Sequence, residues 1–167
     1  MRRVLREMIY PKLCLLCREC EYEEDLGLCD TCCDSLERLP NRCCQLCSRQ
    51  YDGFLTCCQR CVEDPPPWQR AESFYRYTGS SRSLIHAFKY QGRTELVPFC
   101  AQTLSQATVL RQCDLICPVP MHFLKRFFRS YNQVELMAKE LSSLSGLPVV
   151  ESLRRHKWRS AQVRLRR

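Results

Sequence analysis

CLLCRECEYEEDLGLCDTC at residues 14–32 and CQLCSRQYDGFLTCCQRC at residues 44–61 are the two stretches that decide the fold. Each contains two cysteine pairs, and two residues separate the cysteines within a pair. The pairs are Cys14/Cys17 and Cys29/Cys32 in the first stretch, and Cys44/Cys47 and Cys58/Cys61 in the second. A shift of 30 residues brings the leading pairs into register, and a shift of 29 does the same for the trailing pairs. The spacing therefore indicates a tandem repeat.

Paired cysteines of this kind predict metal binding. Two cysteines at this spacing can both point at one ion from a tight turn, and two pairs supply the four thiolates of a structural zinc site. Such a closed site leaves no position for a substrate, so we expect two Zn²⁺ ions that hold the fold. A segment of about 60 residues with few aliphatic side chains needs this support, because its apolar core is small. An iron–sulfur cluster or unliganded thiols are the alternatives.

The cysteine count leaves the ligand register open to alternatives. Twelve of the fifteen cysteines lie between Cys14 and Cys61. Cys20 forms a further pair with Cys17, and three more cysteines adjoin the chosen ligands: Cys33, Cys43 and Cys57. The repeat favours Cys14 over Cys20, because the position 30 residues after Cys20 is Gln50.

A proline run divides the chain into parts of opposite charge. Residues 65–67 are all proline, so we expect a stiff linker at 65–70 between a module at 1–64 and a domain at 71–167. Residues 1–64 hold nine Lys/Arg and twelve Asp/Glu, and residues 65–167 hold seventeen and six. No apolar run approaches the roughly 18 residues of a membrane span. The opening residues lack the apolar core of a signal peptide, which favours a cytoplasmic location.

Beyond the linker, strand and helix patterns alternate. We expect an edge strand at 71–77 and helices from residue 79 to about 91, from 94 to about 109, and at 131–145. Buried strands are expected at 114–117 and from residue 147 to 150. Strand, helix and strand in this order predict a right-handed parallel βαβ unit. The predicted fold class is therefore α/β, with a double zinc-ribbon module followed by a partial parallel sheet with flanking helices.

Taken together, these motifs resemble the ComF family of competence proteins, which join a double zinc ribbon to a type I phosphoribosyltransferase domain. The resemblance rests on the four cysteine pairs and on three segments: SLIHAFKYQGR at residues 83–93, PVP at 118–120 and RSYNQ at 129–133. It extends over nearly the whole chain, and its motifs are specific in combination.

The resemblance implies a domain that binds phosphoribosyl pyrophosphate with Mg²⁺. It places four residues near the pyrophosphate, where fixed charge and N–H donors bind polyphosphate: Arg126, Arg129, Asn132 and Gln133. The alternative is that Arg126, Arg129 and Asn132 form a solvated basic loop and a helix cap. Family members also carry a strand with paired acidic residues and a Gly-rich phosphate loop, which this sequence lacks. We therefore expect a truncated domain without transfer activity, and Mg²⁺ binding only if the full domain exists.

A binding module is the second interpretation. Residues 122–167 hold eleven Lys/Arg against three acids, interleaved with aromatic residues. This mixture is typical of surfaces that bind single-stranded DNA through phosphate charge and base stacking. The family's link with DNA uptake implies the same ligand, and it suggests a competence helicase or another uptake protein as a partner.

Overall fold

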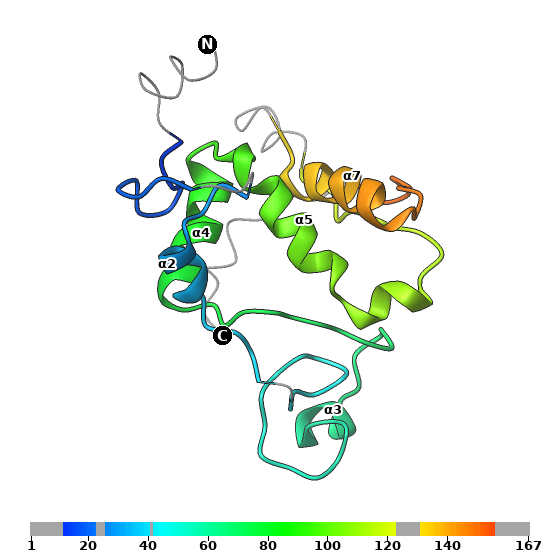
Figure 1. Ribbon diagram of the computed structural model, residues 1–167. Helices are drawn as coiled ribbons and strands as arrows, with labels where there is room; N and C mark the ends of the chain where they lie inside the picture. The colour runs from blue at the N-terminus through cyan, green and yellow to red at the C-terminus, as the bar shows by residue number, and fades with distance from the viewer. Residues whose placement is uncertain (1–11, 23–25, 41, 123–130, 156–167) are drawn as a thin grey trace.

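The computed structural model describes residues 12–22, 26–40, 42–122 and 131–155 (Figure 1). In chain order, with η for a 3-10 helix, its helices are α2 (Asp30–Asp34), α3 (Gln59–Glu63), α4 (Gly79–Tyr90), η1 (Thr94–Leu96), α5 (Val97–Ser105), η2 (Thr108–Gln112) and α7 (Gln133–Ser145). Helices α4, α5 and α7 form the larger body, and α2 lies against α4. The segment that contains α3 stands apart, at the lower end of Figure 1.

One hydrophobic core joins the first cysteine-rich segment to the helical body. Leu28 and Leu36 come from the former, and Leu84, Phe88 and Leu96 come from the latter. Each is at most 4% exposed, and burial of one such side chain contributes roughly 1.5–3 kcal/mol. The second cysteine-rich segment has a separate small cluster, whose fully buried members are all cysteines. That segment therefore has little apolar burial of its own to hold it.

Local sequence sets the ends of α4 and α7. Helix α4 buries Leu84, Ala87 and Phe88 on one face at helical spacing. Helix α7 ends at Gly146, whose φ of +75° is in the left-handed region that glycine adopts without strain. Both helices were expected at these places in the sequence, and both are confirmed.

The single helix expected from residue 94 to about 109 is wrong in its length, because the structure divides it into η1, α5 and η2. Proline at position 98 lies in the first turn of α5, where a missing N–H costs nothing. Near the other end, the hydroxyls of Thr103 and Ser105 donate to the carbonyl oxygens of Phe99 (2.9 Å) and Gln102 (2.8 Å). Such hydroxyls compete for the helix carbonyls and favour termination there.

The start of α7 docks on the end of α4 through buried polar contacts. The last carbonyls of a helix have no partner within it. Gln133, 4% exposed, donates from Nε2 to the carbonyl oxygens of Phe88 (3.3 Å) and Lys89 (3.1 Å). The Tyr131 hydroxyl also donates to the Phe88 oxygen (3.0 Å). These bonds satisfy the end of α4 and fix the position of α7 against it.

The predicted parallel sheet is wrong for the described part of the chain, which contains no β-strand and no sheet. The segments at 114–117 and 147–150 meet at a single parallel bridge, between Ile116 and Val149. The PVP sequence at 118–120 follows at once, and proline has no N–H to extend a ladder. A parallel strand also needs hydrogen-bonded neighbours and cover on both faces. The expectation of buried strands is wrong as well, because no residue of 114–117 or 147–150 is buried, and no further strand of the described residues pairs with this bridge.

Residues 71–77, expected as an edge strand, run as extended chain beside the residues that follow α2. They form one antiparallel bridge, between Arg38 and Tyr75. Backbone hydrogen bonds of 2.8 and 2.9 Å flank this bridge. The segment after the proline run is therefore tied to the first cysteine-rich segment.

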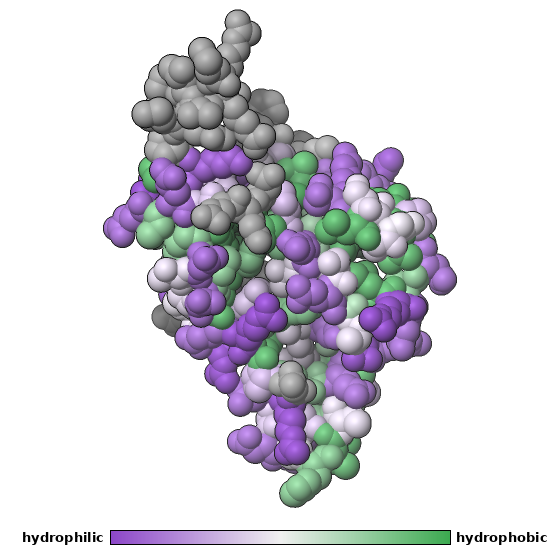
Figure 2. All heavy atoms as spheres, in the orientation of Figure 1, coloured by the Kyte–Doolittle hydropathy of each residue, from purple (hydrophilic) through white to green (hydrophobic). Residues whose placement is uncertain are grey.

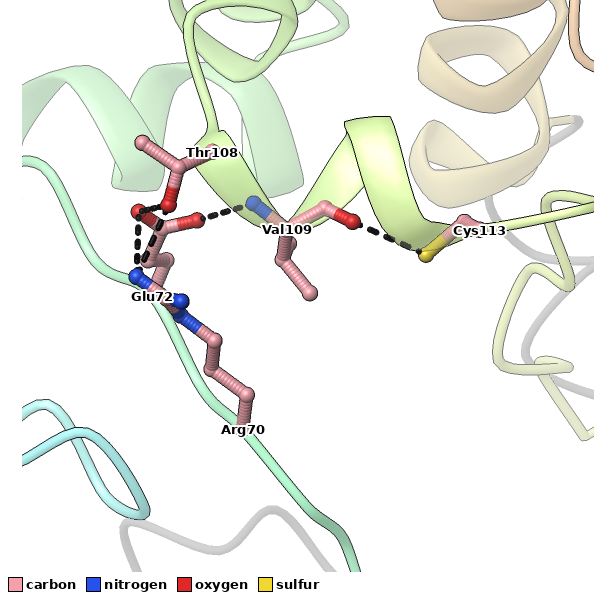
Figure 3. Close-up of polar contacts among 5 residues, drawn as sticks. All are labelled: Arg70, Glu72, Thr108, Val109 and Cys113. Carbon is pink, nitrogen blue, oxygen red and sulfur yellow. Dashed lines mark hydrogen bonds and ion pairs between the residues drawn. The ribbon is translucent and has the colours of Figure 1, made fainter.

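Glu72 fastens this extended segment to η2 (Figure 3). Its carboxylate accepts hydrogen bonds from the Val109 N–H (2.9 Å) and the Thr108 hydroxyl (2.8 Å). The Arg70 guanidinium lies 3.8 Å from the carboxylate and donates to the Thr108 hydroxyl (2.8 Å). Burial acts to raise the pKa of Glu72, but the hydrogen bonds from Val109 and Thr108 outweigh it and lower the pKa. The fold thus stabilises the charged carboxylate.

Apolar side chains are exposed at the end of the molecule that contains α3. Phe54 is fully exposed and Leu55 is 71% exposed, and Figure 2 shows an apolar tip at that end. Adjacent exposed apolar side chains are typical of interaction surfaces. Among the described residues, no helix combines the length and the apolar character needed to cross a bilayer.

We predict that Glu72→Ala lowers the free energy of unfolding by about 1–2 kcal/mol at neutral pH, because two hydrogen bonds to a carboxylate are lost. Folding lowers the pKa of Glu72, so its stabilisation is present above the unfolded-state pKa and is lost as pH falls through the folded-state pKa. The deficit of the variant should therefore shrink in acid. Urea unfolding at a series of pH values measures it, with exposed Glu151→Ala as control. A deficit independent of pH would contradict this role.

Candidate metal centres

The first centre draws its four sulfurs from a turn and from the start of a helix. Cys14 and Cys17 lie on the turn, Cys29 is the N-cap of α2, and Cys32 lies within that helix. All four sulfur atoms lie within 4.8 Å of one another. Cys17 is half-buried and the other three are buried. The centre is thus shielded on most sides by its own segment and by the main core.

The second centre repeats this arrangement. Cys44 and Cys47 lie on a turn, Cys58 is the N-cap of α3, and Cys61 lies within that helix. Their four sulfur atoms also lie within 4.8 Å of one another. The structure therefore brings together the same eight cysteines that the spacing selected, in the same two sets of four.

The two centres share individual backbone features. The Arg18 N–H donates to the Cys14 carbonyl (2.9 Å), and the Ser48 N–H donates to the Cys44 carbonyl (2.7 Å). Arg18 has φ of 61° and Ser48 has φ of 59°, in a region that side-chain-bearing residues rarely adopt. This conformation closes the turn that aims two sulfurs at one point. The sequence repeat is therefore also a repeat of structure.

A second pair of equivalent bonds ties each turn to the segment that precedes its helix. The Leu15 N–H donates to the Gly27 carbonyl (2.8 Å), and the Gln45 N–H donates to the Thr56 carbonyl (3.1 Å). Gly27 has φ of +79°, and a Cβ atom there would lie 2.6 Å from the Leu15 Cδ1 atom. Glycine at this position therefore allows the first turn to close on its helix.

The sulfur separations fit tetrahedral zinc. A Zn–S bond of about 2.3 Å in a tetrahedron places two sulfurs roughly 3.8 Å apart. The Sγ atoms of Cys17 and Cys29 are 3.9 Å apart, and those of Cys47 and Cys58 are 3.7 Å apart. In a cluster of several irons the four cysteine sulfurs are divided among different irons, so some sulfur pairs would lie farther apart, whereas all four lie within 4.8 Å of one another in each centre. Four sulfur ligands leave zinc no open position, so both centres fit a structural role.

The thiols within a centre differ in acidity. Backbone N–H groups, first that of Cys20, lower the pKa of Cys17 to about 6. Burial opposes ionisation of Cys44, but N–H groups, led by that of Cys58, lower its pKa to about 6. Burial, with hydrogen bonds to neighbouring thiols, raises the pKa of Cys61 to about 12. A bound divalent cation favours the thiolate of every ligand, so metal binding displaces the protons that the weaker acids hold.

Neighbouring cysteines stay outside both sulfur clusters. Cys20, the alternative partner of Cys17, is exposed, and the charge of Cys17 raises the pKa of Cys20. The Cys43 thiol donates to the Pro40 carbonyl (3.2 Å). Burial raises the pKa of Cys33, which packs against the main core. The described geometry therefore agrees with the register that the repeat favours.

Of the four residues that the resemblance placed near a pyrophosphate, the structure describes two, Asn132 and Gln133. Arg126 and Arg129 lie outside the described residues. Asn132, 3% exposed, caps α7: its Oδ1 accepts from the N–H two residues on (3.2 Å), and its Nδ2 donates to Glu135 (2.8 Å). Gln133 bonds to α4, as described above. The interpretation of Asn132 as a helix cap is confirmed, and the role of all four toward a ligand stays a prediction.

The chain is similar to proteins named for DNA use and competence. It is 31% identical over 143 residues to the DNA utilization protein YhgH of Salmonella typhimurium, covering 81% of this chain and 63% of that protein. The Escherichia coli YhgH protein is 30% identical over 139 residues, covering 79% and 61%. Competence protein F of Haemophilus influenzae is 23% identical over 147 residues, covering 84% and 63%. The chain thus spans less than two thirds of these relatives. Neither a protein-family model nor a solved structure matches it.

We predict that the purified protein carries two Zn²⁺ ions per chain, one for each set of four sulfurs. Cys14→Ser and Cys44→Ser should each lower the content to one, because three thiolates hold zinc more weakly than four. Elemental analysis of the protein peak from gel filtration measures the ratio. Cys20→Ser is the matched control and should keep both ions. If Cys20→Ser loses zinc while Cys14→Ser keeps it, the register is wrong.

We also predict that Gly27→Ala destabilises the zinc-loaded protein more than Gly92→Ala does. Both glycines have positive φ, +79° and +72°, but a Cβ at Gly92 meets nothing within 4 Å. The loss of unfolding free energy in Gly92→Ala therefore measures the cost of a positive φ at alanine alone, about 1–2 kcal/mol. The additional loss in Gly27→Ala measures the cost of the contact with Leu15. Urea unfolding measures both. Equal losses would show that the Leu15 side chain moves aside freely.

Proposed function

The chain belongs to the ComF family of competence proteins, and we propose that it acts in DNA use as a zinc-stabilised protein that binds single DNA strands. The observation that carries this proposal is the pair of closed four-sulfur centres. Metal held by four sulfurs has no position for a substrate, which supports a scaffold that displays a binding surface. The relatives' names, DNA utilization protein and competence protein, support DNA as the ligand.

Charge also supports a nucleic-acid ligand. The chain has a formal net charge of +8, and Lys and Arg side chains gain affinity for a phosphate backbone by releasing its counterions. Arg49 and Arg60 beside the second centre are exposed, and so are Arg154 and Arg155. Basic charge is thus displayed on the surface of the described part.

Phosphoribosyl transfer is the second candidate, and the family resemblance is its support. The packing of two of its expected ligand residues favours strand binding instead. The Asn132 amide spans the first turn of α7, and the Gln133 amide donates to two carbonyls of α4. Both N–H groups of the Gln133 amide are therefore engaged, and Asn132 is 3% exposed, which supports a structural use of these two side chains. Transfer with Mg²⁺ and phosphoribosyl pyrophosphate remains a prediction for a chain with the complete domain.

A protein partner stays a prediction as well. The resemblance suggests a competence helicase or another uptake protein. Phe54 and Leu55 are adjacent exposed residues of the segment that contains α3, and they would suit such a contact because exposed aromatic and aliphatic side chains gain most from burial by a partner.

The test is a fluorescence-anisotropy titration of a labelled poly-dT strand with the zinc-loaded chain at several salt concentrations. We expect affinity to fall linearly on a log–log plot as salt rises, because phosphate contacts release counterions. Phosphoribosyl pyrophosphate with Mg²⁺ serves as competitor, and it should not displace the strand. Displacement at low concentration would favour the transferase candidate, and absence of strand binding would rule out the proposed function.

A further inference from the structure

A cleft of about 410 Å³ lies beside the second metal centre, between that centre and the proline run. Arg49, Arg60 and Trp68 line it, together with Asp64 and the prolines at 65–67. The cleft thus combines two guanidinium groups, an indole and one carboxylate. The zinc centre itself uses none of these groups.

Trp68 is held in a fixed position at this cleft. Its indole Nε1 donates to the Leu46 carbonyl (2.5 Å), which belongs to the turn of the second centre. Three prolines precede it and restrict the backbone. The side chain is nevertheless 52% exposed. An aromatic ring that is held by a hydrogen bond at one edge and remains half exposed to solvent is suited to stack on a nucleobase.

The two arginines are exposed and carry charge that the described residues do not pair. Arg49 follows the turn of the second centre, and Arg60 lies in α3. In the part of the chain that the structure describes, no ion pair joins either guanidinium to an acid. Asp64 also lines the cleft, so two cations face one anion there. The metal ligands Cys47 and Cys61 line the cleft as well, and zinc with four thiolates adds about −2, so the cleft has no net positive charge. What suits an anionic ligand is the two guanidinium groups left unpaired by the described residues, each of which can bind phosphate oxygens through its fork of donors.

The first centre shows that a four-sulfur unit forms without arginines at the positions of Arg49 and Arg60. The carbonyl of Arg49 accepts from the Cys44 N–H (2.9 Å), and its counterpart in the first unit is Cys20, which accepts from the Cys14 N–H (2.8 Å). The counterpart of Arg60, two residues after the N-cap cysteine, is Thr31. The same backbone therefore forms without either arginine.

Charge also distinguishes the two units as surfaces for a nucleic acid. Residues 12–37 hold two basic and eight acidic side chains, whereas residues 42–64 hold three of each. Each zinc with four thiolates adds about −2 to its unit. With zinc bound, the first unit carries about −8 and the second about −2, so a phosphate backbone is repelled much more strongly by the first. Arg49 and Arg60 of the second unit also lie beside the exposed ring of Trp68.

We propose that this cleft binds single-stranded DNA, with a base stacked on Trp68 and flanking phosphates held by Arg49 and Arg60. The ligand class rests on the function proposed above, and the location rests on the cleft. The second unit stands away from the helical body (Figure 1), so a strand can pass across it. In this arrangement the first unit anchors the pair to the core and the second unit binds the strand.

The experiment titrates a labelled poly-dT strand with the full zinc-loaded chain and its variants. For Arg49→Ala/Arg60→Ala, the slope of log affinity against log salt should become shallower by about 1.4, because each phosphate contact on a single strand contributes about 0.7. Arg82→Ala/Arg111→Ala removes the same charge from exposed sites on α4 and η2 and should leave the slope closer to wild type. Trp68→Ala should weaken binding about tenfold, and Trp68→Phe should restore most of it.

A second measurement reports the stacking contact directly. The chain has two tryptophans, so in a Trp158→Phe background Trp68 is the only residue that emits under excitation selective for tryptophan. We expect poly-dT to quench this fluorescence. Zinc content is measured for every variant.

The outcomes separate the two proposals. If the wild-type chain binds poly-dT but the two double-arginine variants behave alike and Trp68 is not quenched, the cleft is not the site, while the proposed function stands. If the wild-type chain binds no strand, the proposed function and the site both fail. Loss of zinc in Arg49→Ala/Arg60→Ala would also overturn the site, because the arginines would then serve the metal centre.

Discussion

The convergence of four cysteine sulfurs on one point is the constraint on which the rest of the structure depends. To aim two sulfurs from one turn, the backbone passes through a left-handed residue, Arg18 in the first unit and Ser48 in the second. To supply the other two, a helix must begin at a cysteine, as α2 and α3 do. In the first unit this geometry positions Leu28 and Leu36 for the core that they share with α4. Metal binding and burial of apolar surface are therefore coupled there, whereas the second unit relies mainly on its metal centre.

The two units share a backbone and differ in their surroundings, which suggests a division of roles. The first unit is acidic and is packed into the helical body. The second unit projects from that body, and its contacts to the segment after the proline run include the Trp68 bond and a backbone bond from Ala71 to Gln45 (2.9 Å). Such a unit exposes more of its surface. The second unit differs from the first in its two cleft arginines, in the Trp68 indole that contacts it and in its exposed apolar side chains. The functional proposals rest on these differences.

The metal ligands and the ends of helices could be predicted from the sequence, because each depends on residues that are close together in the chain. The shift of 29 or 30 residues selects the same eight cysteines that the structure brings together, and Gly146 marks the end of α7. The presence of a parallel sheet could not be predicted in this way. An apolar run such as that around Ile116 has the same sequence pattern whether or not other strands are there to pair with it. The cleft was missed because Arg49 and Arg60 are 11 positions apart in the sequence, and only the fold brings them to one cleft. The repeat itself offers a signal that could have found them: the shifts of 30 and 29 residues pair Arg49 with Glu19 and Arg60 with Thr31, so both arginines are particular to the second unit.

The central claim is that each set of four cysteines closes around one zinc ion and leaves it no other ligand. X-ray absorption at the zinc K edge, on the purified full chain, tests this claim most directly. A single shell of four sulfurs at about 2.3 Å, with no nitrogen or oxygen contribution, is the predicted result. A shell that mixes sulfur with nitrogen or oxygen would contradict it, as would a protein that contains iron in place of zinc.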